Sequence, residues 1–63
     1  MMPFVSVEAL PGKSLQQKRD LVKAITDAVS NVYGVPREAV RVVLRYNTKE
    51  DIGWGGVLMC DKE

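Results

Sequence analysis

The sequence predicts a single α+β domain over residues 1–63, in which two parallel strands are joined by one crossover helix and followed by a short strand or hairpin. Three segments support this prediction. Residues 3–10 alternate in polarity, residues 14–33 repeat with a helical period, and residues 40–46 are rich in β-branched side chains. A strand, a helix and a strand in this order form a β-α-β unit, whose strands run parallel and whose connection is right-handed.

The first strand is expected at residues 3–10, where side chains alternate with a period of two. Val5, Val7 and Ala9 share one face, and Phe4, Ser6, Glu8 and Leu10 share the other. Pro3 is compatible with this strand because it stands at the start, where no ladder N–H is needed. Pro11 and Gly12 then end the strand.

The helix is expected to begin after Ser14, which forms a capping-box pattern with Gln17. Its apolar stripe comprises Leu21, Val22, Ile25, Ala28, Val29, Val32 and Tyr33, so Tyr33 is expected in the core. The opposite side, expected in solvent, comprises Lys18, Arg19, Lys23, Asp27, Ser30 and Asn31. Gly34 is expected to cap the C-terminal end of the helix, and Pro36 prevents the helix from resuming.

The second strand is expected at residues 40–46, after a short turn at residues 36–39. Arg41, Val43 and Arg45 share one face, and Val42, Leu44 and Tyr46 share the other. Residues 47–51 form a polar turn, and the glycine-rich residues 53–56 follow. Residues 57–60 are expected to add a short third strand.

Self-association is expected because a chain of 63 residues buries only about 60% of the surface that its unfolded form exposes. The lone Cys60 and the absence of histidine exclude an internal disulfide and an ordinary zinc site as sources of stability. One helix covers one face of a two-stranded sheet, and the other face carries Phe4, Leu10 and Val43. The sheets are therefore expected to pack inside an oligomer, with the charges of this face at its edges or in a site between subunits.

The composition argues against several classes of function. Nine basic and eight acidic residues give a net charge of +1, too small a field for nonspecific binding to nucleic acid or anionic membrane. No apolar run reaches the ~20 residues of a membrane span, and no signal-peptide pattern follows Met1. The lone Cys60 suits a reducing compartment, so a cytoplasmic location is expected.

The usual catalytic motifs are also missing. Without histidine there is no Ser-His or Cys-His pair, and no phosphate-binding GxxxxGK[ST] loop is present. Residues 53–56, Gly-Trp-Gly-Gly, lack the strand–loop–helix context of a nucleotide-binding loop. What remains is a proline near the N-terminus and the arginines of the second strand.

These remaining residues belong to a pattern that covers essentially the whole chain. The segments MPFVSV (2–7), LPGKS (10–14) with QK (17–18), VRV (40–42) and IGWGG (52–56) resemble the 4-oxalocrotonate tautomerases in order and spacing. The resemblance implies a β-α-β subunit, dimers that pair their sheets, and a homohexamer built as a trimer of dimers. It also implies keto–enol isomerisation of a small anionic unsaturated 2-oxo acid, without metal or cofactor.

The resemblance assigns roles to five residues. Pro3 matches the catalytic proline, whose terminal secondary amine titrates near neutrality, whereas an ordinary lysine titrates near ~10.4. Arg41 matches the arginine that binds a substrate oxygen and stabilises the developing enolate. Lys13 stands where well-studied members place a carboxylate-binding arginine, and it keeps the charge without the bidentate fork. Ile52 replaces a phenylalanine of the pocket wall, and Trp54 supplies some of that bulk.

Several alternatives remain open. Because the chain begins Met1-Met2-Pro3, Pro3 is an amide until both methionines are removed, as would follow from a start at Met2. A retained methionine, together with Lys13, would suit a non-catalytic structural subunit of a hetero-oligomeric tautomerase. Family relatives also act as dehalogenases, hydratases or decarboxylases, and a simple interaction module is a third possibility. Arg41 and Arg45 could instead form surface ion pairs, and Lys13 could be a solvated loop residue. Pro3 could be a strand-start proline without a chemical role, and Ile52 and Trp54 are expected in packing or interface contacts more than in specific substrate contacts.

Overall fold

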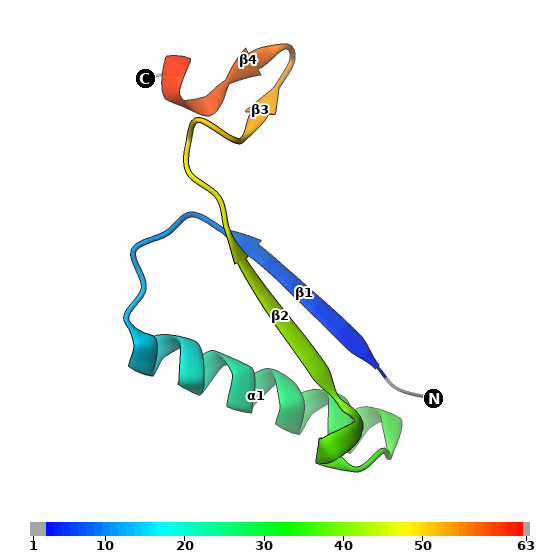
Figure 1. The fold of residues 1–63 in the computed structure, drawn as a ribbon. Coiled ribbons are helices and arrows are strands. Elements are labelled where there is room, and N and C mark those ends of the chain that lie inside the picture. Colours follow the sequence, from blue (N-terminus) through cyan, green and yellow to red (C-terminus); the bar gives the residue numbers. More distant parts are fainter. Residues whose placement is uncertain (1–2, 63) are drawn as a thin grey trace.

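The computed structural model describes residues 3–62 and has the predicted β-α-β order (Figure 1). The elements are β1 (Phe4–Ala9), α1 (Leu15–Tyr33), the short 3-10 helix η1 (Arg37–Ala39), β2 (Arg41–Tyr46), β3 (Gly53–Trp54), β4 (Val57–Leu58) and a second 3-10 helix η2 (Met59–Asp61). β1 and β2 pair in parallel, with Phe4 opposite Arg41 at one end and Ala9 opposite Tyr46 at the other. The questions about Met1 and Met2 fall outside the described residues.

The two ends of α1 form as the sequence predicts. The Ser14 hydroxyl accepts a hydrogen bond from the Gln17 backbone N–H at 3.1 Å, and the Gln17 side chain accepts one from the Ser14 N–H at 2.9 Å. Gly34 adopts φ 68° at the other end, a left-handed conformation that costs glycine little, and its N–H donates to the Ser30 carbonyl at 3.0 Å. Local side-chain chemistry therefore determines the length of the helix.

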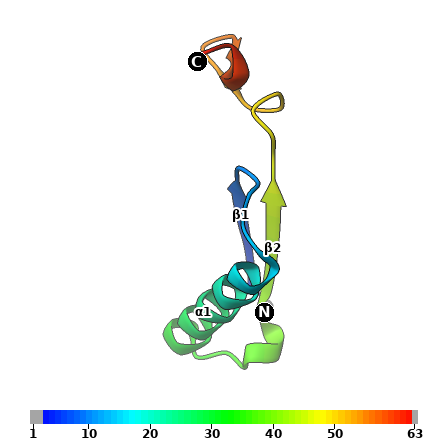
Figure 2. The same cartoon turned by 90° about the vertical axis from the view of Figure 1, so that its left-hand side faces the viewer.

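α1 covers one face of the β1–β2 sheet and leaves the other face open (Figure 2). Val5 and Val7 are half-buried, whereas Phe4 on the opposite face is 70% exposed. Within residues 3–62 the only hydrophobic residue classed as buried is Val40, at 9% exposure. The radius of gyration is 15.0 Å, against about 11 Å for a compact chain of this length. The single subunit therefore lacks a closed core, as expected of a chain that packs against other copies.

Several expectations about α1 need correction. Val32 belongs to the predicted apolar stripe but is 80% exposed. Tyr33, expected in the core, is the last residue of α1 and is 66% exposed. Lys18, expected in solvent, lies over the Tyr46 ring at 4.6 Å from its centroid. Ser30, also expected in solvent, is part-buried and donates to the Val35 carbonyl at 2.6 Å. Thr26 is buried beside the sheet although it is polar.

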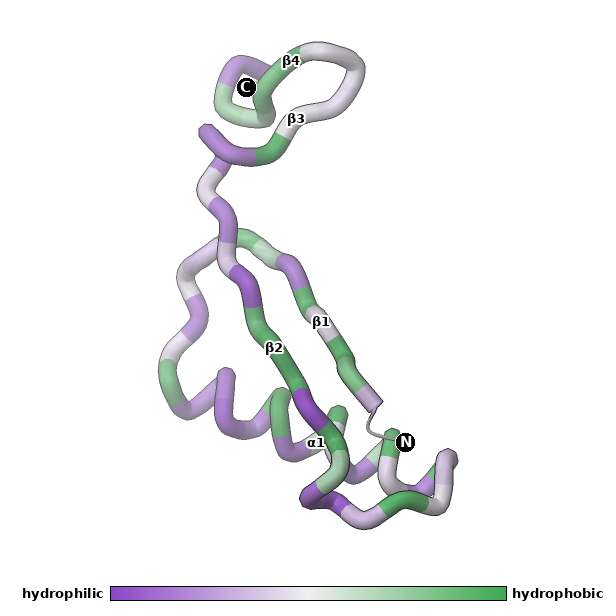
Figure 3. Tube along the Cα trace, turned by 45° about the vertical axis from the view of Figure 1, so that its right-hand side comes forward, coloured by the Kyte–Doolittle hydropathy of each residue, from purple (hydrophilic) through white to green (hydrophobic). Residues whose placement is uncertain are grey.

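Residues 47–62, here called the C-terminal arm, extend beyond the end of the sheet (Figures 1 and 2). β3 and β4 form an antiparallel hairpin, and Gly55 and Gly56 turn it with φ of 63° and 82°, values that favour glycine. The third strand predicted for residues 57–60 stops at Leu58, and Cys60 lies in η2 instead. Hydrophobic residues occur in β1, in β2 and in this arm (Figure 3), so the arm also carries apolar surface that its own subunit leaves exposed.

Candidate active site

Pro3 and Arg41 lie together where β1 and β2 begin. The Arg41 backbone N–H donates to the Pro3 carbonyl at 2.9 Å, which extends the parallel ladder by one residue. Pro3 is half-buried, and this hydrogen bond uses its carbonyl and leaves its nitrogen uninvolved. The backbones of Pro3 and Arg41, two residues of the predicted site, are therefore neighbours within one chain.

The Arg41 side chain is anchored but not neutralised. Its Nη1 donates to the Glu38 backbone carbonyl at 2.7 Å, and the residue is exposed. The turn of η1 thus holds the guanidinium near the start of β2. Among the ion pairs of residues 3–62, none involves Arg41. A guanidinium held by a backbone carbonyl keeps its full charge and several free donors for an anionic ligand.

The other three predicted residues lie at the opposite end of the sheet. Lys13 is exposed in the loop between β1 and α1, and Ile52 and Trp54 belong to the C-terminal arm. The six residues of β1 separate these two ends by about 20 Å at ~3.3 Å per residue. One chain therefore brings Pro3 and Arg41 together but does not bring Lys13, Ile52 or Trp54 to them.

The arm holds its own residues in a fixed arrangement. The Ile52 carbonyl accepts from the Met59 N–H at 2.7 Å, which closes the base of the hairpin. Trp54 remains 54% exposed, and the Lys62 ammonium lies over its ring at 4.5 Å from the centroid. Ile52 is half-buried. These contacts present an indole ring and a cation on a segment that reaches away from its own sheet.

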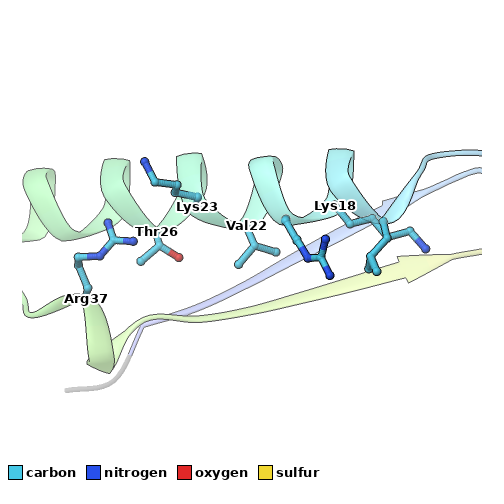
Figure 4. Close-up of a pocket in the computed structure, with 7 residues that line it drawn as sticks. Lys18, Val22, Lys23, Thr26 and Arg37 are labelled. Carbon is cyan, nitrogen blue, oxygen red and sulfur yellow. The ribbon is translucent and has the colours of Figure 1, made fainter.

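A second concave region was not predicted. A groove of about 570 Å³ runs along the flank of α1, lined by Leu15, Lys18, Arg19, Val22, Lys23, Thr26 and Arg37 (Figure 4). None of the five predicted site residues lines it. The helical periodicity of the sequence assigned most of the basic residues of this groove to solvent. Their position beside β2 depends on how α1 packs on the sheet, and periodicity alone does not specify that packing.

The described part of the chain shows neither a metal centre nor a membrane span. Within residues 3–62 no group of three or more metal-ligating side chains is gathered. No helix in that range combines the length and the apolar character needed to cross a bilayer. Cys60 is a free, half-buried cysteine whose sulfur lies 3.8 Å from an Asp61 carboxylate oxygen.

Comparison with known proteins identifies the family. The family model with the description "Tautomerase enzyme" matches residues 3–62, a range that starts at Pro3. The chain belongs to the tautomerase family. A protein named "Probable tautomerase" from Lactiplantibacillus plantarum is 42% identical over 62 residues, covering 98% of this chain and 97% of that protein.

Solved structures of tautomerase homologues agree with this assignment. A crystal structure of a 4-oxalocrotonate tautomerase homologue superposes with a TM-score of 0.84 at 39% identity, over 98% of each chain. A heterohexameric 4-oxalocrotonate tautomerase from Chloroflexus aurantiacus superposes with a TM-score of 0.82 at 26% identity, over 98% of this chain and 100% of that chain. The β-α-β fold and the family resemblance expected from the sequence are thereby confirmed.

Proposed function

We propose that this tautomerase-family chain catalyses keto–enol isomerisation of a small, anionic, unsaturated 2-oxo acid, with Pro3 as general base. The observation that carries the proposal is the juxtaposition of Pro3 with the un-neutralised Arg41 at the start of the two parallel strands. The start of the family match at Pro3 supports the same residue. We further propose that the enzyme acts in the cytoplasm and needs neither metal nor cofactor.

The chemistry requires Pro3 to be the first residue. A free secondary amine takes the proton from the enol oxygen of the substrate and delivers it to a carbon as the ketone forms, so the reaction has no net proton change. The pyrrolidine ring restricts the backbone and so helps to fix the direction of the nitrogen lone pair. Arg41 stabilises the negative charge that develops on the enolate oxygen. Removal of both methionines is therefore a condition of this mechanism.

The two separated halves of the site can be joined by a second copy. Within residues 3–62 the sheet contains only β1 and β2, so β1 has an open edge. Antiparallel pairing of two β1 edges about a two-fold axis places the start of one strand beside the end of the other. Lys13 and the C-terminal arm of one copy then approach Pro3 and Arg41 of its partner.

This arrangement gives the distant residues their roles. Lys13 binds a substrate carboxylate as a point charge, whereas Ile52 and Trp54 form an apolar wall over the reacting carbons. The open, Phe4-bearing face of the sheet is left for contacts between dimers. We therefore propose a homohexamer, built as a trimer of dimers.

Mass spectrometry of the intact, natively expressed protein tests the first condition. The expected mass is that of a chain beginning at Pro3. Ketonisation of 2-hydroxymuconate and phenylenolpyruvate by this protein is then compared with that of Pro3→Ala. Pro3→Ala replaces the constrained ring amine by a freely rotating primary amine, and this is expected to lower kcat at least about 100-fold. Equal rates in both proteins, or a retained methionine in an active enzyme, would contradict the Pro3 mechanism.

A second candidate is a non-catalytic subunit of a hetero-oligomeric tautomerase. Met1-Met2 before Pro3 favours it, as does a structural neighbour that is itself a heterohexamer. This candidate predicts a retained methionine and no activity of the chain alone. Turnover of 3-chloroacrylate, measured in parallel, distinguishes a dehalogenase or hydratase from both.

A further inference from the structure

The groove on the flank of α1 shares no lining residue with the Pro3–Arg41 site, and its lining combines apolar and basic side chains. Val22 and Thr26 point from α1 toward the sheet, and Arg37 reaches from η1 toward the helix (Figure 4). Leu15 adds exposed apolar surface at one end. The remaining lining residues, Lys18, Arg19 and Lys23, are basic. Its volume of about 570 Å³ lies within the range of roughly 300–1,000 Å³ typical of small-molecule sites.

The charges of the groove are unevenly neutralised along its length. At the end near η1, Arg37 and Lys23 share the single carboxylate of Asp27. The other acidic residue of α1, Asp20, accepts a hydrogen bond from the Gln16 amide at 2.9 Å. Among residues 3–62, the four basic side chains of the lining therefore have one carboxylate, that of Asp27, as ion-pair partner.

The excess positive charge gathers at the end of the groove near the start of α1. The Lys18 ammonium lies above the Tyr46 ring, and Arg19 donates a long hydrogen bond of 3.4 Å to the Gln16 side chain. The first turn of α1 contains no acidic residue, so the helix dipole there adds to the same field. Within residues 3–62, these two cations therefore stand beside an apolar surface without a carboxylate partner.

We propose that this groove binds a small amphipathic anion. Its carboxylate, sulfonate or phosphate head lies between Lys18 and Arg19, and its apolar body lies along Leu15 and Val22. A ligand with an anionic head and an apolar body fits this lining. Its head meets the unpaired cations, and its body meets the apolar side chains, so each part leaves water for a favourable contact. The site would be distinct from the tautomerase site and would not require a second copy.

A segment of another copy is the competing occupant. The C-terminal arm carries both acidic and apolar residues, including Asp61 and Trp54. In the proposed dimer, however, the arm lies beside Pro3 of the partner, at the start of the strands. The groove along α1 is then left for a small ligand.

Fluorescence titration with 8-anilinonaphthalene-1-sulfonate tests the proposal on the full-length assembled protein. Binding is expected to weaken about tenfold in the Lys18→Gln/Arg19→Gln double variant, because each exposed charge contact contributes up to about 1 kcal/mol. The Lys18→Arg/Arg19→Lys variant keeps one ammonium and one guanidinium beside the head group, so it is expected to bind within about twofold of the original protein. Lys62→Gln removes one positive charge outside the groove and is expected to leave the affinity unchanged.

Competition with two amphiphiles identifies the role of the head group. Dodecanoate is expected to displace the probe, whereas dodecyltrimethylammonium, which has the same tail and the opposite charge, is expected not to. Equal affinity in the double-glutamine variant, or equal displacement by both amphiphiles, would overturn the proposal. Dissociation of the assembly by that variant in sedimentation, with its circular dichroism unchanged, would instead assign the groove to a subunit interface and also overturn it.

Discussion

The two ends of the β1–β2 sheet differ in what they contribute to a site. Where the strands begin, Pro3 and Arg41 are held together by a backbone hydrogen bond, and the guanidinium is fixed by the Glu38 carbonyl. Where the strands end, Lys13 is an exposed loop residue, and Trp54 is carried on an arm that extends past its own sheet. The first end holds Pro3, the proposed base, and one cation, and the second holds the other cation and the proposed apolar wall.

This difference explains how so small a chain could build an active site. The groove on α1 is not lined by Pro3, and the described part of the subunit is thinly packed. A two-fold axis that brings the strand starts of one copy beside the strand ends of the other would create two equivalent sites. The same contact would bury exposed apolar surface. Stability and catalysis would then depend on the same contacts.

The largest effect is expected at the end where the strands begin. Arg41→Gln is expected to lower kcat/KM for 2-hydroxymuconate about 100-fold, because it removes a donor that stabilises the enolate. Arg45→Gln is the matched control, since Arg45 is also an exposed β2 arginine, and its expected change is less than about threefold. Equal losses in the two variants would show that Arg41 acts only through general charge.

Substitution of Trp54 tests whether the C-terminal arm contacts another subunit in the assembly. Trp54→Ala is expected to raise the subunit dissociation constant about 30-fold, as for a large side chain buried on assembly. Trp54→Phe keeps an aromatic ring and is expected to recover most of this loss. Sedimentation at a series of concentrations measures both. An unchanged dissociation constant in Trp54→Ala would mean that the indole stays in solvent.

Substitution of Lys13 tests whether a substrate carboxylate is bound at the end of the sheet where the strands finish. Lys13→Gln is expected to raise KM for 2-hydroxymuconate about tenfold, because a charge-assisted contact is lost. Lys13→Arg is expected to lower KM for this dicarboxylate, since the guanidinium binds a carboxylate in a bidentate manner. Steady-state kinetics with the monocarboxylate phenylenolpyruvate provide the comparison. A KM for the dicarboxylate that is the same in all three proteins would exclude a binding role for Lys13.

The smallest effect concerns the cap that follows Lys13. Ser14→Ala is expected to lower the free energy of unfolding by about 1 kcal/mol, because the capping box is lost. Thr48→Ala in the arm, which removes an exposed hydrogen bond of 3.2 Å to Asp51, is expected to change it by less than about 0.5 kcal/mol. Urea unfolding at fixed protein concentration compares the two. A larger loss in Thr48→Ala would show that the arm, not the helix cap, limits stability.

The sequence was sufficient for the elements whose determinants are local. The capping box at Ser14, the left-handed Gly34 and the alternation of β1 all involve neighbours in the chain, and the structure contains each of them. Exposure of Tyr33 and stacking of Lys18 were not predictable, because both depend on where α1 crosses a sheet of limited length.

The candidate site was predictable only in part for the same reason. Family resemblance selected Pro3 and Arg41, and the register of two parallel strands places them together. The distance from Pro3 to Lys13 depends on the length of β1. The basic groove depends on the packing of α1 beside β2, a contact between segments far apart in the sequence.

Mixed assemblies test most directly whether the site is shared between copies. Pro3→Ala and Lys13→Glu chains, each of low activity alone, are unfolded, mixed in equal amounts and refolded together. In a mixed dimer, one of the two sites combines an intact Pro3 with an intact Lys13. Random pairing is therefore expected to restore about a quarter of the original activity. Activity no greater than the sum of the two separate proteins would contradict a site built from both ends of the sheet.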